Sequence, residues 1–312
     1  MTLADALADF ELILRANYSP ATVRTYEYAL GKFARSAASS SGRRWDGGVG
    51  GLTVDHFIKF AAALARANYS TRTRTVCNSA AKAFMDWLIV NGHTEVSVQD
   101  DRRYRMAIRQ YTGKTPPKPR TVPPRGVMAE VVRAALQWAH LYPTSERMAM
   151  EAVVVEFLFT TGCRASELTT LRAADLDLGN GTAVILGKGA KTRTVLFPQR
   201  TVALLEAYWQ VREPNGVYAF SRPKTGGPVT TKHVRAAVAG ACSAYAIRYP
   251  NESPVHVTPH SFRHSFATHM LERTGNLALV QDLLGHSSPT TTRIYAQVLP
   301  KTAKEAYEKA MG

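Results

Sequence analysis

Residues 176–197 read LDLGNGTAVILGKGAKTRTVLF, and this stretch decides the fold class. Three short segments rich in Val, Ile, Leu and Thr (176–178, 182–186 and 191–197) alternate with glycine turns. Such runs separated by tight glycine turns are typical of antiparallel strands. The stretch therefore predicts a small three-stranded antiparallel sheet.

Helical spacing dominates the segments on both sides of this sheet, where apolar residues recur every three or four positions. Thr161-Gly162 is expected to end a helix, because glycine readily adopts a left-handed conformation. The predicted fold class is therefore mainly α with a small antiparallel β-sheet. The predicted helices are 128–142, 145–160 and 164–172, and helix returns after Thr201, with loops at 223–228 and 249–257.

A basic, proline-rich stretch precedes these elements. Residues 113–126 read GKTPPKPRTVPPRG, and proline disfavours helix in the residue before it. We therefore expect a linker at 114–125 between two domains, 1–113 and 126–312. The first is predicted to be all-α with four or five helices, including 3–15, 20–38, 54–67 and 70–91.

The composition is that of a folded, basic protein. Hydrophobic residues make up 45% of the 312 residues and charged residues 20%, which excludes disordered and collagen-like classes. The formal net charge of +15 divides into +5, +4 and +6 over the first domain, the linker and the second domain. A polyanionic partner that contacts all three parts and an ordinary basic protein explain this charge equally well.

Several classes of protein do not fit the sequence. The most apolar stretch, 152–160, contains Glu156 and is too short to span a membrane, and the N-terminus carries Asp5 and Asp9 where a signal peptide is basic. The cysteines are odd in number and lack a C-x-x-C pair, which argues against a disulfide framework or a zinc ribbon. A reducing cytoplasm fits best. The cysteines are Cys77, Cys163 and Cys242.

Two helix ends near the C-terminus carry side chains suited to chemistry. Residues 258–264 read TPHSFRH, so Thr258 is a predicted N-cap, and His260 and Arg263 fall on one helical face. Farther on, Gly285 is expected to end a helix that starts after Asn276, which leaves His286 just outside it. A further helix is predicted from 288 to 299, with Tyr295 about two turns in.

Together with Arg164 in the stretch TGCRASEL (161–168), these segments resemble the tyrosine recombinase, or integrase, family in its two-domain, Xer-like form. The family's motifs are T-G-x-R-x-x-E-L, G-K-G-x-K, H-x-x-R-H and L-L-G-H-S followed by a tyrosine. The order Arg, Lys, His, Arg, His, Tyr over about 130 positions makes a specific signal, and His264 belongs to the same H-x-x-R-H motif. The motif residues are Arg164, Lys188, His260, Arg263, His264, His286 and Tyr295.

The resemblance implies a helical core-binding domain joined to a mixed α/β catalytic domain. It implies a site-specific recombinase that cleaves and rejoins double-stranded DNA through a 3′-phosphotyrosyl intermediate and a Holliday junction, without a metal or a high-energy cofactor. It also implies a tetramer that assembles on DNA at the nucleoid, with the C-terminal segment 301–312 exchanged between protomers. Recombination with or without accessory proteins fits the family. Alternatively, the segment 301–312 packs on its own domain.

The resemblance and elementary chemistry assign a role to each residue. Two guanidiniums, Arg164 and Arg263, suit the extra charge of a phosphoryl transition state. Tyr295 is the expected nucleophile, and His260 is the nearby proton acceptor or a hydrogen-bond donor to the phosphate. In the family, the lysine at 188 protonates the departing 5′ oxygen and the histidine at 286 binds a non-bridging oxygen. Glu167 is expected to orient Arg164, and His264 to be a buried, hydrogen-bonded supporting residue.

Several alternatives stay open at this point. Lys191 or Arg193 competes for the role of Lys188. His260, His264 and His269 form a candidate metal site, but a weak one, because no Glu or Cys lies nearby to complete it. Two other functions also fit the motifs. A type IB topoisomerase uses similar chemistry to relax DNA, and a DNA-binding regulator with a decayed active site would retain the fold.

Overall fold

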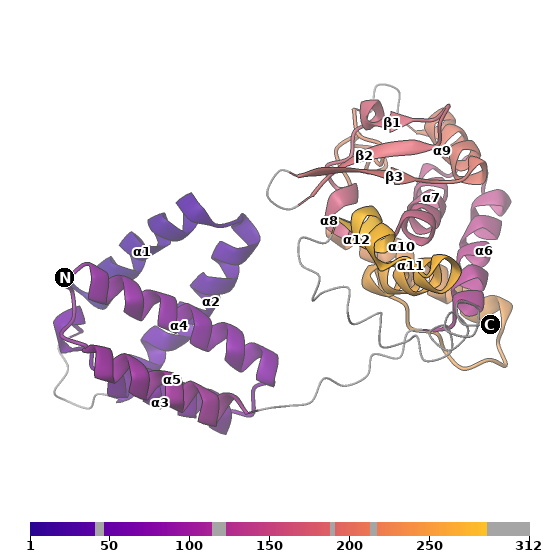
Figure 1. Ribbon diagram of the computed structural model, residues 1–312. Coiled ribbons are helices and arrows are strands. Elements are labelled where there is room, and N and C mark those ends of the chain that lie inside the picture. Colours follow the sequence, from indigo (N-terminus) through magenta and orange to yellow (C-terminus); the bar gives the residue numbers. More distant parts are fainter. Residues whose placement is uncertain (41–46, 114–122, 188–190, 213–216, 286–312) are drawn as a thin grey trace, which may run out of the picture. The chain divides into compact units, whose positions relative to one another are not determined.

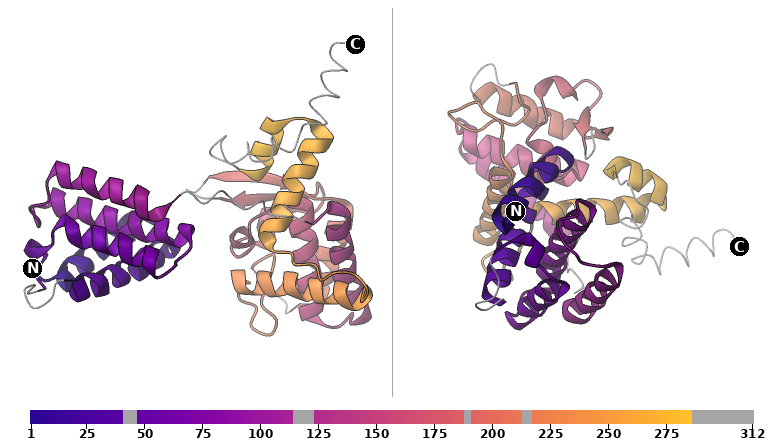
Figure 2. Two further views of the ribbon diagram at one scale, coloured as in Figure 1. Left: turned by 90° about the horizontal axis from the view of Figure 1, so that it is seen from below. Right: turned by 90° about the vertical axis from the view of Figure 1, so that its left-hand side faces the viewer.

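The computed structural model (Figures 1 and 2) describes residues 1–40, 47–113, 123–187, 191–212 and 217–285. The chain divides into two compact units, Met1–Pro119 and Arg120–Gly312. Throughout these described ranges, no helix is both long and apolar enough to cross a membrane. Cys77, Cys163 and Cys242 are free.

The described part of the first unit is helical, as predicted. Its core is built on phenylalanines, and the rings of Phe33 and Phe57 stack with their centroids 4.5 Å apart. The four helices named from the sequence are confirmed, and a fifth follows Ser97, whose side chain accepts a hydrogen bond from the Asp100 amide. The helices are α1 (Leu3–Asn17), α2 (Pro20–Ser40), α3 (Val54–Arg66), α4 (Thr71–Val90) and α5 (Val98–Thr112).

The second unit surrounds one central helix, α7, which is buried on most of its faces. It packs against α6, α9, α10 and α11, and Figure 1 shows these helices gathered around it. A helix that is apolar all round belongs in a core rather than on a surface. The helices are α6 (Arg125–Leu141), α7 (Glu146–Thr161), α8 (Ala165–Leu168), α9 (Gln199–Val211), α10 (Thr231–Arg248), α11 (Pro259–Thr274) and α12 (Leu277–Leu284).

The predicted sheet is confirmed in strand number, order and direction. Strands β1 (Leu176–Asp177), β2 (Thr182–Leu186) and β3 (Thr192–Leu196) pair antiparallel in sequence order. Ile185 lies opposite Arg193 and Ala183 opposite Val195, so these four side chains share one face. Ala183, Ile185 and Val195 are buried in the core of the unit, so the face that Arg193 shares is the inner one.

Two predicted helix boundaries were wrong. The helix expected over 164–172 ends at Leu168, because the hydroxyls of Thr169 and Thr170 donate to the nearby carbonyls of Ser166 and Glu167. The chain then continues through a short 3₁₀ turn, Ala173–Asp175. The helix expected to start at 128 begins at Arg125, directly after Pro124, whose carbonyl accepts a bond from the Met128 amide.

Candidate active site

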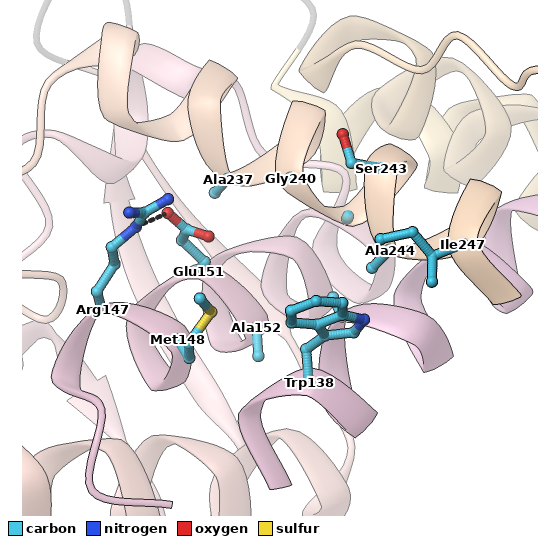
Figure 3. Close-up of a pocket in the computed structure, with 12 residues that line it drawn as sticks. Trp138, Arg147, Met148, Glu151, Ala152, Ala237, Gly240, Ser243, Ala244 and Ile247 are labelled. Atoms are coloured by element: carbon cyan, nitrogen blue, oxygen red, sulfur yellow. Dashed lines mark hydrogen bonds and ion pairs between the residues drawn. The ribbon is translucent and has the colours of Figure 1, made fainter. Parts of the chain in front are cut away.

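The second unit contains an apolar pocket that is unsuited to phosphate chemistry. It has a volume of about 170 Å³ and lies among α6, α7 and α10, with Trp138 and Ile247 in its wall (Figure 3). Among its lining residues only Arg147 and Glu151 are charged, and they pair with each other at 2.8 Å. No unpaired cation is left there to receive a phosphate.

A second pocket collects positive charge instead. Its volume is about 300 Å³, and it brings together three residues predicted from two separate motifs, Arg164 from the first and His260 and Arg263 from the second. It lies at the N-terminus of α11, a 16-residue helix whose dipole adds positive potential there. The pocket is therefore built to receive an anion. The other lining residues are Ala165, Arg235, Thr258 and Pro259.

Arg164 is placed by the end of α7 and the start of α8. The left-handed Gly162 (φ 64°) ends α7, and a Cβ added there would lie 2.6 Å from Cδ1 of Phe266. Arg164 then caps α8: its amide donates to Oε2 of Glu167 at 2.7 Å and its Nη1 to Oε1 at 2.8 Å. The Arg164 side chain is 39% exposed and that of Glu167 only 4%, so the buried carboxylate orients a guanidinium that still reaches the pocket.

His260 and Arg263 are placed by the start of α11. Thr258 caps this helix by accepting from the Ser261 amide, as predicted, and His260 is exposed in the first turn. Arg263 is only 3% exposed. It donates to the carbonyls of Gly162 (2.9 Å) and Leu284 (2.6 Å), so it both lines the pocket and joins the ends of α7 and α12.

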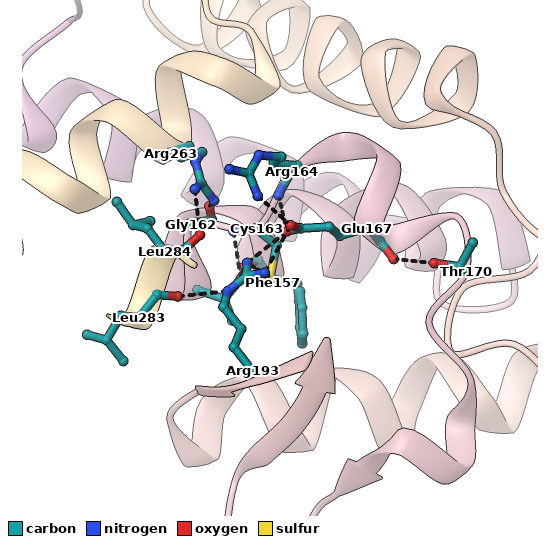
Figure 4. A network of polar contacts seen from close by, with 11 residues as sticks. Phe157, Gly162, Cys163, Arg164, Glu167, Thr170, Arg193, Arg263, Leu283 and Leu284 are labelled. Atoms are coloured by element: carbon teal, nitrogen blue, oxygen red, sulfur yellow. Dashed lines mark hydrogen bonds and ion pairs between the residues drawn. The ribbon is translucent and has the colours of Figure 1, made fainter. Parts of the chain in front are cut away.

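Arg164 belongs to a polar network that is centred on the Glu167 carboxylate (Figure 4). Arg193 donates to both carboxylate oxygens of Glu167, at 2.9 and 2.8 Å, and its Nε donates to the Leu283 carbonyl at 2.9 Å. Burial raises the pKa of Glu167, but the hydrogen bonds from Arg193 and from the Arg164 amide outweigh it and leave the pKa lowered. The Arg193 guanidinium is therefore held among these acceptors, and it is not one of the residues that line the pocket.

Three predicted site residues lie outside the described residues: Lys188, His286 and Tyr295. The positions next to two of them are described. The Gly187 amide donates to the Lys191 carbonyl at 2.7 Å and closes the base of the β2–β3 hairpin. Gly285 ends α12 in the left-handed conformation, as predicted (φ 62°), and a Cβ there would lie 2.8 Å from Cδ of Arg193. The segment 301–312 also lies outside the described residues.

Two further histidines and one arginine complete the description of the site. His264 lies on α11 and is half-buried rather than buried as expected, and His269 is half-buried as well. Within the described ranges, no group of three or more His, Cys, Asp or Glu side chains is placed to hold a metal ion. Arg235, an exposed residue early in α10 that lines the pocket, lies in none of the predicted motifs, because the packing of α10 near α8 and α11 is what brings it there.

Comparison with known sequences identifies both halves of the chain. The phage integrase family matches residues 128–302, and the phage integrase N-terminal SAM-like domain matches residues 8–92. The tyrosine recombinase XerA of Pyrococcus furiosus is 31% identical over 292 residues, which cover 93% of this chain and 87% of that protein. The tyrosine recombinase XerC of Proteus mirabilis is 28% identical, with 94% and 88% covered.

Solved structures agree on the fold. The Tn1549 transposon integrase in complex with transposon right end DNA has a TM-score of 0.71 at 17% identity, with all of both chains covered. A lambda integrase dimer bound to a COC′ core site has a TM-score of 0.69 at 16% identity, with 96% and 97% covered. The family match and the XerA relative show that the chain belongs to the phage integrase family, and it is a tyrosine recombinase.

Proposed function

We propose that this recombinase cleaves and rejoins duplex DNA at a specific site through a covalent bond to Tyr295. The observation that carries the proposal is the convergence of Arg164, His260 and Arg263 in one cationic pocket. Support also comes from relatives of the same fold that were solved with DNA, among them the XerH recombinase bound to its difH substrate. The pocket would hold the phosphodiester that is cut.

The proposed cleavage step is a transfer of the phosphoryl group to tyrosine. The Tyr295 oxygen attacks phosphorus while its proton passes to His260, and a P–O(Tyr) bond forms. The bond from phosphorus to the 5′ oxygen breaks, and Lys188 protonates that oxygen. The phosphotyrosyl ester retains the free energy of the broken bond, so a 5′ hydroxyl rejoins the strand by the reverse step without a high-energy cofactor.

The arginines supply the electrostatic part of this mechanism. Negative charge builds up on the non-bridging oxygens as the nucleophile adds, and guanidiniums offer paired donors that match those oxygens. Arg164, at the start of α8, and Arg263, on α11, take this role in the pocket that both line. His286 is a further donor. Glu167 holds Arg164 in place through the two hydrogen bonds described above.

The assembly follows from the same proposal. Domain 1–113 and domain 126–312, joined by the basic linker 114–125, would grip the duplex mainly through phosphates, with base contacts that choose the site. Four protomers would synapse two sites on nucleoid DNA in the cytoplasm and exchange strands through a Holliday junction. Docking of 301–312 on a neighbouring protomer would couple assembly to cleavage; a deletion of 301–312 that changes neither tetramer formation nor cleavage rate would disprove that coupling.

The first experiment recovers the DNA that becomes covalently joined to the protein in cells and sequences it. A nicked duplex of that sequence should then trap a covalent adduct with the purified wild-type chain. Tyr295→Phe should abolish the adduct because the nucleophilic oxygen is gone, while Tyr142→Phe, at a half-exposed tyrosine outside the pocket, should not. An adduct that survives Tyr295→Phe would disprove the nucleophile assignment.

A plasmid with two copies of the recovered site separates recombination from simple relaxation. The proposal expects deletion or inversion products, according to the relative orientation of the two sites. Relaxation of supercoils without either product would assign the chain to topoisomerase chemistry instead.

A further inference from the structure

Arg193 is a buried arginine that contacts two separate segments beside the pocket. It lies on the inner face of the sheet, opposite Ile185, and its side chain is 9% exposed. It holds both oxygens of Glu167 and the carbonyl of Leu283, and its Nη2 also lies 3.9 Å from Sγ of Cys163. A buried guanidinium with this many acceptors is fixed in one position.

The charges in this network are unequal. Glu167 carries one negative charge, and two guanidiniums contact it. Arg193 takes both carboxylate oxygens from a buried position, while the side chain of Arg164 takes one from a position that is 39% exposed. The carboxylate is therefore compensated chiefly by Arg193, and Arg164 keeps positive charge for the pocket that it lines.

Removal of Arg193 would reverse this division. A carboxylate that is 4% exposed does not stay unpaired, because an isolated buried charge is strongly unfavourable. Among the described residues, Arg164 would be the remaining hydrogen-bond partner of the Glu167 carboxylate, and its guanidinium can turn to form a bidentate pair with it. That pair would draw both the charge and the donors of Arg164 away from the pocket.

The same side chain fixes the end of α12. Its Nε bond to Leu283 comes two residues before Gly285, and the Gly285 Cα packs so close to Arg193 that a side chain there would collide with it. Arg193 thus holds the last turn of α12, while Arg263 holds the Leu284 carbonyl from the other side of the network. The C-terminal end of α12, directly before His286 in the sequence, is therefore fixed by Arg193 and Arg263.

We propose that Arg193 is a positioning residue for recombination: it compensates the charge of Glu167, so that Arg164 presents its own charge to the phosphate, and it anchors the end of α12 beside the pocket. This inference rests on the proposed function, because its purpose is the phosphoryl transfer at Arg164. Arg193 itself does not contact the DNA phosphate.

The test compares Arg193→Gln, Arg193→Lys and the double variant E167Q/R193Q in adduct formation on the nicked duplex. Arg193→Gln should slow adduct formation by roughly ten- to a hundredfold, as expected for a misplaced catalytic group. Arg193→Lys retains the charge and should recover part of the loss. E167Q/R193Q removes both charges of the buried pair and should form the adduct faster than Arg193→Gln, which a purely structural role does not explain.

A matched control exists in the same unit. Arg200 donates at 2.7 Å to another buried carboxylate, Glu156, and does not line the cationic pocket. Arg200→Gln should lower stability without changing the rate of adduct formation per folded molecule. Thermal unfolding and DNA affinity, measured for every variant, separate loss of fold or binding from loss of chemistry.

Two results would overturn the inference. One is an Arg193→Gln variant that forms the adduct as fast as wild type; the other is an E167Q/R193Q variant no faster than Arg193→Gln. If Arg193→Gln does not fold, Arg193→Lys decides the case, since the inference requires it to be slower than wild type at equal DNA affinity. Absence of any adduct with the wild-type chain would instead reject the proposed function, so the two failures are distinct.

Discussion

Arg263 on α11 and Leu284 at the end of α12 are joined by a 2.6 Å hydrogen bond from Nη2 to the carbonyl oxygen. Nη1 of the same guanidinium donates at 2.9 Å to the carbonyl of Gly162, which ends α7. One side chain therefore satisfies buried carbonyls at two helix ends, which have no partner within their own helix, and lines the anion pocket between them. The pocket and the packing of these helices depend on the same residue.

Arg263→Lys is the direct test of this double role. Lysine lacks the planar fork and cannot bond both carbonyls in the same geometry, so it is not a conservative change here. Adduct formation should fall by about 10²–10³-fold, and the free energy of unfolding by about 1–3 kcal/mol, because a buried carbonyl loses its donor. The control is Arg273→Lys, at an exposed position on the same helix. Equal adduct rates in the two variants would contradict the assignment.

Gly162→Ala tests the close approach of α7 and α11. Both Gly162 and Gly275 are left-handed helix ends (φ 64° and 62°), but only at Gly162 would a Cβ meet another residue, 2.6 Å from Phe266; nothing lies within 4 Å at Gly275. Gly275→Ala should therefore cost only the backbone strain, about 1–2 kcal/mol. Gly162→Ala should cost a further ~1–3 kcal/mol from overpacking. Denaturant unfolding of both variants measures the difference, and equal losses would show that the Phe266 contact is unimportant.

Local signals explain which parts of the fold were predictable. Thr258, Asn276 and Gly285 carry cap chemistry that acts within a few residues, and the structure places the caps where the sequence indicates. The first-domain helix α5 has a weak apolar pattern because six of its 15 residues are charged, and its buried face depends on a few residues such as Tyr104 and Ala107. Where a hydroxyl competes for a backbone carbonyl, as at Thr169, the end of a helix could not be read from periodicity.

The candidate site divides in the same way. Motif order singled out Arg164, His260 and Arg263, and the structure brings them to one pocket. The alternation of side chains along β3 places Arg193 on the inner face of the sheet. Its partners Glu167 and Leu283, however, are 26 and 90 residues away in the sequence. No local pattern encodes contacts at that distance. The partnership therefore became visible only in three dimensions.

Arg235→Gln tests whether the pocket extends to α10. Arg235 is an exposed cation on the pocket wall, so we expect it to contact a DNA phosphate. Its removal should weaken DNA binding and reduce the slope of log affinity against log salt concentration by about one unit. The control, Arg133→Gln, removes an exposed arginine outside the pocket that pairs with Glu130, and should leave the slope unchanged. Identical slopes in both variants would exclude a phosphate contact at Arg235.

Acid should weaken the fold through Glu167. Its pKa is lowered in the folded state from the ordinary value of 4.5, so folding favours the ionised form. The contribution is fully present above about pH 4.5 and is lost as the pH falls through the lower folded-state pKa.

Glu167→Gln leaves the buried Arg193 without its counter-charge and should lower the free energy of unfolding by about 3–5 kcal/mol at pH 7. Urea unfolding from pH 7 to pH 3 should show the gap between wild type and Glu167→Gln narrowing below about pH 4.5. Glu272→Gln, at an exposed position, should follow wild type throughout. A gap that stays constant with pH would mean that Glu167 does not titrate with folding, and that its charge is not what holds Arg193 in the network.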